Sequence, residues 1–167
     1  MTRIISIILV SIIAFNISKA QSKENIEGIA LEIINQADFC SLVTIDNNGY
    51  PAARMMQTLP VEDDFFIWLG TKPNTQKVKQ IKTNSKVSVY YTEANSTGYV
   101  NVKGKAEIIN NRESKNKFWK EGWETFYPNK EKDFVLIKIK PHKLQIVSYE
   151  NRIVSKEDDW RAVEIVF

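Results

Sequence analysis

Three consecutive runs decide the fold: YPAARMMQ (50–57), FFIWLGT (65–71) and NTQKVKQI (74–81). The first two runs have the composition of strands, and the third has the apolar spacing of a helix. Arg54 stands among apolar neighbours in the first strand, and Thr75 and Lys77 stand where the helix begins. An arginine on a strand and a lysine at a helix N-terminus can converge on one anion, and phosphate suits such donors best. The stretch therefore predicts a phosphate-binding site.

The sequence before this stretch predicts a hairpin. Phe39–Ile45 is rich in apolar and β-branched residues, and Asp46–Gly49 ends in Asn-Gly, which tolerates positive φ. Pro60–Asp64 forms the next turn. Three strands joined by such short turns predict an antiparallel meander.

Further elements follow from periodicity. Helices are expected at 22–37, 74–83 and 110–127, and strands at 87–91, 98–109, 134–139, 144–149 and 160–167. At least six short antiparallel strands with three inserted helices predict a mainly β protein, a small closed or split β-barrel with helices at its ends. A sandwich is the alternative.

Residues 1–20 have the pattern of an export signal. Arg3 is followed by an almost wholly apolar run from Ile4 to Ile17, and Ser18-Lys19-Ala20 resembles a cleavage site. We expect cleavage after Ala20 and an exported, periplasmic or secreted protein. An uncleaved anchor and a core helix are the alternatives. The barrel domain is then expected at 21–150, with a C-terminal tail at 151–167 that adds a strand.

The formal net charge of +3 falls to +1 when Arg3 and Lys19 are removed with the signal. No basic stripe is evident in the remaining sequence, and the lysines from Lys115 to Lys143 are interrupted by acidic residues. This balance argues against nucleic acid or an acidic membrane as partner.

The chain has a single cysteine, Cys40, and a single histidine, His142. These counts exclude an intrachain disulfide and a cysteine-based metal cluster, and no metal site is expected. Cys40 lies in an apolar run and is interpreted as a small buried hydrophobe, and His142 after Pro141 as part of a surface turn. Hydrolytic chemistry finds little support.

The order of these pieces is similar to a known family. Six pieces follow one another along the chain. They are a strand before Asn-Gly, a return strand with Pro-x-x-Arg-Met-Met, a strand ending Leu-Gly-Thr, a helix with Thr-x-Lys-Val-x-x-Ile, and the segments NSKVSVYY (84–91) and VKGKAE (102–107). This series resembles the pyridoxamine 5′-phosphate oxidase-like FMN-binding split barrels, in the branch of the general stress protein 26 type, over roughly residues 23–149. The resemblance implies a six-stranded split barrel that forms a homodimer, with FMN at the dimer interface and an oxidoreductase activity on a small substrate.

The resemblance also implies roles for individual residues. It places the FMN phosphate on Arg54, Thr75 and Lys77, a hydroxyl contact on Thr71, and the flavin ring along the backbone of Met55 and Met56. Tyr99 falls where the oxidase branch has a glutamine near the flavin, and Tyr149 where the stress-protein branch has an aromatic residue.

Three departures from the oxidase branch argue against vitamin B6 phosphate as substrate. Gln76 replaces a second cation, Leu59 replaces a substrate-binding lysine, and the C-terminal Trp and Arg motif is not evident.

Other interpretations stay open at this point. Arg54 could pair with Glu62 or Asp63 across strands, Lys77 could be an ordinary solvated lysine, and one of the two methionines must point into the core because successive strand residues alternate. The protein could also bind a flavin or a haem without turnover, or serve as a dimeric interaction protein without cofactor.

Overall fold

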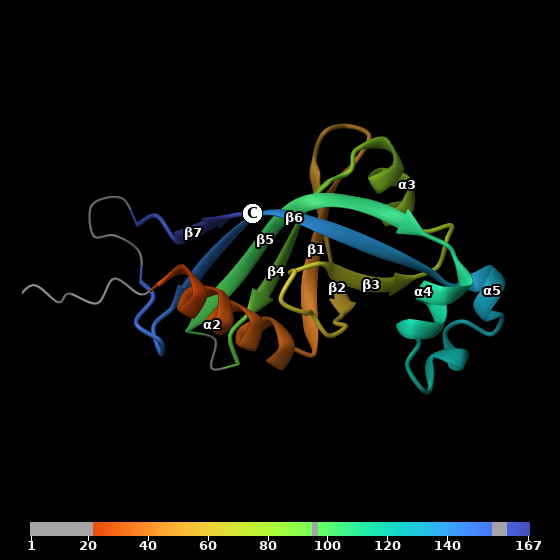
Figure 1. Cartoon of the computed structure of the whole chain (residues 1–167). Helices are drawn as coiled ribbons and strands as arrows, with labels where there is room; N and C mark the ends of the chain where they lie inside the picture. Colours follow the sequence, from red (N-terminus) through yellow and green to blue (C-terminus); the bar gives the residue numbers. More distant parts are fainter. Residues whose placement is uncertain (1–21, 95–96, 155–159) are drawn as a thin grey trace, which may run out of the picture.

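The structure is a computed structural model that describes residues 22–94, 97–154 and 160–167 (Figure 1). The expected export signal at residues 1–20 lies outside the described residues. The strands are β1 (Phe39–Ile45), β2 (Pro51–Gln57), β3 (Ile67–Thr71), β4 (Lys86–Thr92), β5 (Gly98–Ile109), β6 (Val135–Ser148) and β7 (Val163–Val166). The helices are α2 (Lys23–Gln36), α3 (Gln76–Thr83), α4 (Arg112–Lys117), the 3₁₀ turn η1 (Trp123–Thr125) and α5 (Lys130–Asp133).

The seven strands of the described residues form one antiparallel sheet, in which six follow the order β2-β1-β4-β5-β6-β3 and β7 pairs with β6 beside this path. The long strand β6 pairs with β3 through its first residues and with β7 through Lys143–Ile146. The outer strands β2 and β3 approach each other without pairing, so the curved sheet stays open. This arrangement confirms the predicted mainly β split barrel.

The β1–β2 hairpin forms as predicted. Gly49 has a φ of 85°, and the Asp46 carboxylate accepts hydrogen bonds from the backbone N–H groups of Asn48 and Tyr50, both at 2.9 Å. The turn sets a register in which Leu42 lies opposite Arg54. The meander, however, is wrong at its third strand, because β3 crosses the open side of the barrel and pairs with β6 rather than with β2.

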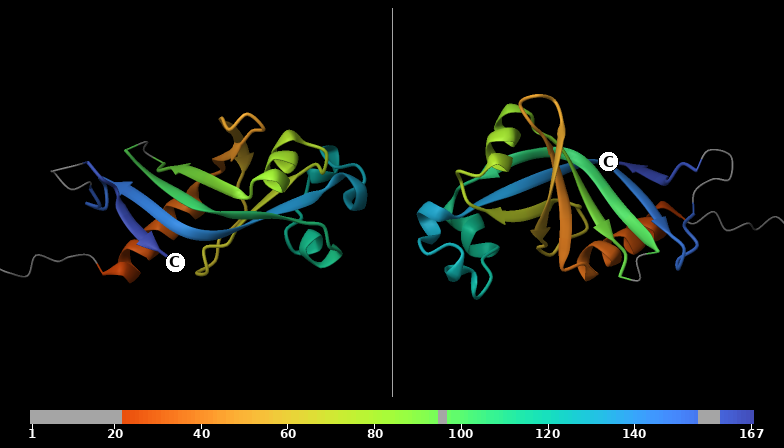
Figure 2. Two further views of the ribbon diagram at one scale, coloured as in Figure 1. Left: turned by 90° about the horizontal axis from the view of Figure 1, so that it is seen from above. Right: turned by 180° about the vertical axis from the view of Figure 1, so that it is seen from behind.

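Alternation along the strands builds the core. The side chains of Leu42, Val89, Val102 and Leu144 lie in one row across four strands and are fully buried. Helix α2 covers this core with three buried residues (Ala30, Ile33 and Ile34), and Ser22 caps it as predicted. Figure 2 shows α2 and α3 at separate places around the sheet, with α3 near the β1–β2 turn.

The expected single helix at 110–127 is wrong. Helix α4 ends at Lys117, and Gly122, with a φ of 84°, turns the chain before η1. In this stretch Trp123 belongs to a second small core with Leu59, Phe134 and Leu136, and Phe118 and Trp119 pack against it, whereas Phe126 is exposed. This packing overrides the helical pattern and gives Trp119 and Trp123 a structural role.

Candidate anion-binding site

Arg54 is the centre of a hydrogen-bonded network at the open side of the barrel. Its position on β2 opposite Leu42 directs it to the inner face of the sheet, where it is half-buried. Nη1 donates to the carbonyl oxygen of Leu42 at 3.2 Å and to Oγ1 of Thr44 at 2.7 Å, and Nη2 donates to Oε1 of Gln80 at 2.9 Å. Three acceptors, two from strand β1 and one from helix α3, thus hold the guanidinium in one place.

Thr44 and Gln80 are residues that the sequence analysis missed. The fully buried Thr44 hydroxyl donates to the same Gln80 oxygen at 2.5 Å, so one side-chain amide ties β1, β2 and α3 together. Two signals were available in the sequence. Thr44 is the polar member of an inward-facing series with Cys40 and Leu42, and Gln80 follows Lys77 by three residues, on the same face of α3.

Lys77 brings a second positive charge to this network. Its Nζ donates to Oγ1 of the buried Thr71, at the end of β3, over 3.2 Å. Burial, and next the neighbouring charge of Arg54, lower the pKa of Lys77, and burial also lowers the pKa of Arg54. Both shifts reflect the electrostatic cost of burying a cation, and the shift of Lys77 also reflects the nearby charge of Arg54.

No acidic partner offsets these charges within the described ranges. No ion pair joins Arg54 or Lys77 to a carboxylate there, and Glu62, the partner considered for Arg54, lies 3.6 Å from Lys117 instead. The Arg54 partners are neutral oxygens, which orient the guanidinium and leave its charge available. Two adjacent, uncompensated cations are the signature of a site for an anion.

The guanidinium also retains hydrogen-bonding capacity. It carries about five N–H donors, and three of them are engaged by the acceptors above. The remaining donors, the Lys77 ammonium and the Thr71 hydroxyl form a donor set that suits a phosphate group.

Thr75 and Gln76, the other residues at the start of α3, contribute less to the candidate anion-binding site. The Thr75 hydroxyl donates to the carbonyl oxygen of Lys72 at 3.1 Å and makes no capping hydrogen bond to α3. Gln76 is exposed and uncharged, so it adds no positive charge to the site.

The side chains of Met55, Met56 and Tyr99 lie away from the Arg54 site within one chain. Met56 is in the core, whereas Met55 is 72% exposed on the outer face. Tyr99 shares that outer face by strand register and stacks on Tyr90 with ring centroids 5.0 Å apart. Within one chain the structure therefore gathers Arg54, Thr71 and Lys77, and leaves Met55 and Tyr99 on the opposite face.

The remaining candidates have no contact with this site. Tyr149 is exposed in the turn after β6, and Leu59 is buried in the second core. Cys40 is buried as predicted, and burial raises the pKa of its thiol to about 12, which argues against a nucleophilic role. His142 lies inside β6 rather than in a turn, which corrects the prediction.

The described part of the chain contains no cluster of three or more histidine, cysteine or acidic side chains that could hold a metal ion. No helix in that part combines the length and the apolar character needed to cross a bilayer.

Comparison with known proteins identifies the family. General stress protein 26 of Bacillus subtilis (strain 168) is 28% identical over 131 residues, which are 76% of this chain and 91% of that protein. A structure of a protein related to general stress protein 26 from Clostridium acetobutylicum superposes with a TM-score of 0.72 at 21% identity, covering 87% of this chain and 97% of the other. General stress protein 26 from Bacillus anthracis str. Sterne gives a TM-score of 0.65 at 27% identity, covering 73% of this chain and 93% of the other.

A sequence profile described as "Pyridoxamine 5'-phosphate oxidase like" matches residues 24–152, which include the hairpin, both cations of the site and most of the sheet. The chain belongs to the pyridoxamine 5′-phosphate oxidase like family.

Proposed function

We propose that the chain is an FMN-binding oxidoreductase that holds the cofactor phosphate with Arg54, Lys77 and Thr71. The observation that carries this proposal is the pair of neighbouring cations without a carboxylate partner among the described residues. A phosphate dianion needs about two cationic partners together with neutral donors to offset its desolvation. This site supplies that set.

Bound flavin supplies the redox chemistry itself, so the protein needs no catalytic cysteine or histidine. The residues of the chain bind and orient the cofactor. Gln80 and Thr44 position Arg54 through neutral acceptors, which keeps the guanidinium charge directed at the phosphate. The family resemblance adds the backbone of Met55 and Met56 along the ring.

A homodimer with FMN at the interface is part of the proposal. Tyr99, assigned to the flavin by resemblance, lies on the face opposite Arg54 in one chain. In the proposed dimer, a second copy that packs on the outer face brings its Tyr99 to the neighbouring phosphate site. The exposure of Met55 and Tyr90 on this face supports such packing.

Vitamin B6 phosphate is not the substrate that the site favours. Leu59, where the oxidase branch has a substrate-binding lysine, is packed in a small aromatic core and presents no charge. The proposed substrate is another small molecule that exchanges electrons with the flavin. We also propose export through a cleaved signal at residues 1–20, which an intact mass of the protein isolated from its host tests.

The alternative function is binding of a flavin or haem without turnover. It is favoured by the scarcity of groups that could act as general acid or base, because the hydrogen-bond partners of Arg54 are a backbone carbonyl, a threonine and a glutamine. Reduction of bound flavin by NAD(P)H or a quinol separates turnover from simple binding.

The test compares FMN with riboflavin, which lacks the phosphate. We expect a shifted flavin spectrum with FMN, much weaker binding of riboflavin, and an FMN affinity about a hundredfold lower in Arg54→Ala. Lys82→Ala, on the exposed face of α3, serves as the control and should bind FMN like the wild type. Equal affinity for both flavins, or a folded Arg54→Ala protein that binds FMN normally, would contradict the proposed phosphate site.

A further inference from the structure

Three hollows lie in a row between the loop at residues 58–66 and the end of α4. Their volumes are about 240, 330 and 140 Å³. Pro60 lines all three, Lys120 lines the first and second, and Lys117 lines the second and third. Because neighbouring hollows share their walls, they form one elongated groove, which we call the loop groove. Its middle hollow alone reaches the size range of ligand pockets, about 300–1,000 Å³.

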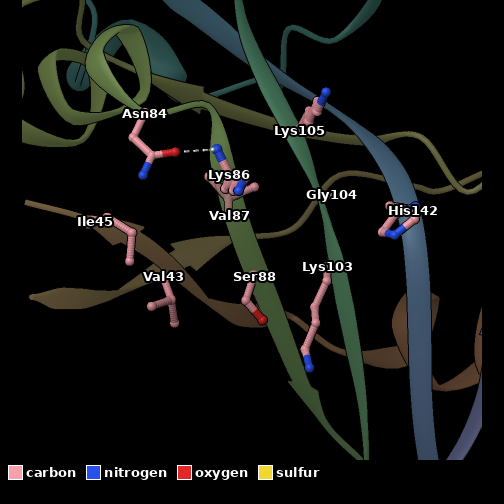
Figure 3. Close-up of a pocket in the computed structure, with 10 residues that line it drawn as sticks. All are labelled: Val43, Ile45, Asn84, Lys86, Val87, Ser88, Lys103, Gly104, Lys105 and His142. Atoms are coloured by element: carbon pink, nitrogen blue, oxygen red, sulfur yellow. Dashed lines mark hydrogen bonds between the residues drawn. The ribbon is translucent and has the colours of Figure 1, made fainter. Parts of the chain in front are cut away.

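The loop groove lies outside the two surfaces described so far, and it shares no residue with the Arg54 site. The hollow in Figure 3, about 610 Å³, is lined by Val43, Ile45 and lysines of β4 and β5 on the outer face, which a second copy covers in the proposed dimer. Lys138, at the far end of the loop groove, pairs with Glu107, eight residues along β5 from Tyr99. At about 3.3 Å per residue, roughly 26 Å of strand separates this end from Tyr99.

The charges along the loop groove balance one another. Three lysines and three acidic residues line it: Lys117, Lys120, Lys138, Asp38, Glu62 and Asp64. A charged ligand of either sign therefore finds no net attraction, in contrast to the Arg54 site. A wholly apolar ligand would remove these charged groups from water without replacing their hydrogen bonds.

An exposed ion pair crosses the middle of the loop groove. Nζ of Lys117 lies 3.6 Å from Oε1 of Glu62, and both side chains are more than half exposed. Ion pairs of this kind contribute little to stability, because water solvates both groups well. Lys117 and Glu62 can therefore exchange this contact for hydrogen bonds to a polar ligand.

Aromatic rings supply the apolar part of the wall. Phe66, Trp68, Phe118 and Trp119 are half-buried and line the second and third hollows. Trp68 and Phe118 stack with their ring centroids 4.4 Å apart, so no slot opens between them for a proline ring. The groove thus combines ring surface with groups that donate or accept hydrogen bonds.

A chain of sugar rings satisfies this combination. Hydroxyl groups both donate and accept, so they can pair with the lysines and with the carboxylates, while the C–H faces of a sugar pack against aromatic side chains. A peptide would need a free strand edge, an apolar groove for a helix or an open slot between rings. We propose that the loop groove binds a neutral oligosaccharide, with successive rings in successive hollows.

The probes are cellotetraose, maltotetraose and chitotetraose, each compared with its own monosaccharide by isothermal titration calorimetry on the full chain. We expect at least one tetrasaccharide to bind at least about tenfold more tightly than its monosaccharide, because it occupies several hollows at once. Absence of binding by all three, or equal affinity of every tetrasaccharide and its monosaccharide, would overturn the proposal.

The matched variants are Glu62→Ala, in the middle of the groove, and Asp63→Ala, the next residue, which lines none of the three hollows. Glu62→Ala should lower tetrasaccharide affinity about tenfold, and Asp63→Ala should leave it unchanged. Both side chains are exposed, so both proteins should unfold at the wild-type temperature. Phe118→Leu repeats the test on the aromatic wall. Unchanged affinity in both Glu62→Ala and a folded Phe118→Leu would contradict binding in this groove.

Two further outcomes assign the groove or the sugar elsewhere. Binding of a proline-rich peptide that Glu62→Ala weakens, without binding of any tetrasaccharide, assigns the groove to a peptide and overturns the proposal. Arg54→Ala should bind the tetrasaccharide like the wild type, and loss of this binding in a folded Arg54→Ala protein assigns the sugar to the Arg54 site. Because FMN binding is measured separately, its failure would leave the oligosaccharide result unaffected.

Discussion

The molecule carries two groups of positive charge that differ in how the cations are held. Arg54 and Lys77 are half-buried, and each is fixed by hydrogen bonds to neutral oxygens. The row of Lys86, Lys105 and Lys140 is exposed, and strand pairing alone places these three lysines side by side on β4, β5 and β6. The first group is preorganised and desolvated, so it can select one anion by geometry. The second is exposed to solvent, so it can select only by charge and by the apolar surface beside it.

Conservative exchanges should reveal this difference most strongly. Arg54→Lys keeps the charge but cannot reach all three acceptors of the guanidinium, so we expect FMN affinity to fall about thirtyfold. The matched exchange Lys105→Arg, in the exposed row, should change FMN affinity less than about twofold. Flavin fluorescence quenching measures both effects. An Arg54→Lys protein with unchanged FMN affinity would show that the geometry of this group does not matter.

Gln80→Glu tests whether the neutral partner of Arg54 is essential. The carboxylate keeps an acceptor oxygen for both Arg54 and Thr44, but it neutralises the guanidinium. We expect FMN affinity to fall about tenfold, riboflavin affinity to stay unchanged and thermal stability not to decrease.

Lys82→Gln lowers the net charge by the same amount on the same helix and is the control for Gln80→Glu. If it weakens FMN binding equally, overall charge rather than the Arg54 network governs affinity.

The lowered pKa of Lys77 predicts that FMN binding at Arg54 and Lys77 depends on pH. Phosphate binding favours the protonated lysine, so FMN affinity should be full below the pKa of Lys77 in the free protein and should fall as pH rises through it. The free energy of unfolding of the free protein should rise in the window between that pKa and the ordinary value of 10.5, because the unfolded chain binds more protons there.

Fluorescence titrations and chemical denaturation across this window measure the two opposite trends. Lys77→Arg keeps its charge and should remove both. Persistence of the fall in affinity in Lys77→Arg would assign it to another group.

Ionic strength should produce the smallest difference in FMN affinity between variants of the two groups of cations. The screening length falls from about 10 Å at 0.1 M to about 3 Å at 1 M ionic strength, and exposed charges are screened more than buried ones. We expect the effect of Lys105→Glu on FMN affinity, about twofold at the lower salt, to vanish at the higher salt, and the effect of Arg54→Lys to persist. Equal salt dependence of the two effects would contradict the assignment of the lysine row to an exposed, unheld group.

The sequence predicted most of the sheet because its strands have strong local signals. Asn48-Gly49 determines a hairpin, and alternation along β1, β4 and β5 separates buried from exposed residues. It failed where tertiary packing decided the outcome. Local turns suggested that β3 follows β2 in a meander, whereas the closing curvature of the barrel pairs β3 with β6.

The candidate site was predicted in part for the same reason. Arg54 and Lys77 belong to a recognisable local motif, and in the structure the charge of Arg54 lies close enough to lower the pKa of Lys77. Thr44 and Gln80 carry no motif of their own, because their importance comes only from meeting Arg54 across 10 and 26 residues of sequence.

The strands, the hairpin and the candidate cations Arg54 and Lys77 could be recognised from the sequence, since each signal comes from residues that are close along the chain. Only the tertiary structure decided which neutral groups hold Arg54 and which lysines face one another on the outer sheet. Lys86, Lys105 and Lys140 are far apart in the sequence, with acidic residues between them, and read there as solvated charges. Strand pairing brings them side by side and leaves the acidic residues elsewhere, because antiparallel register, not sequence distance, sets which side chains share a surface.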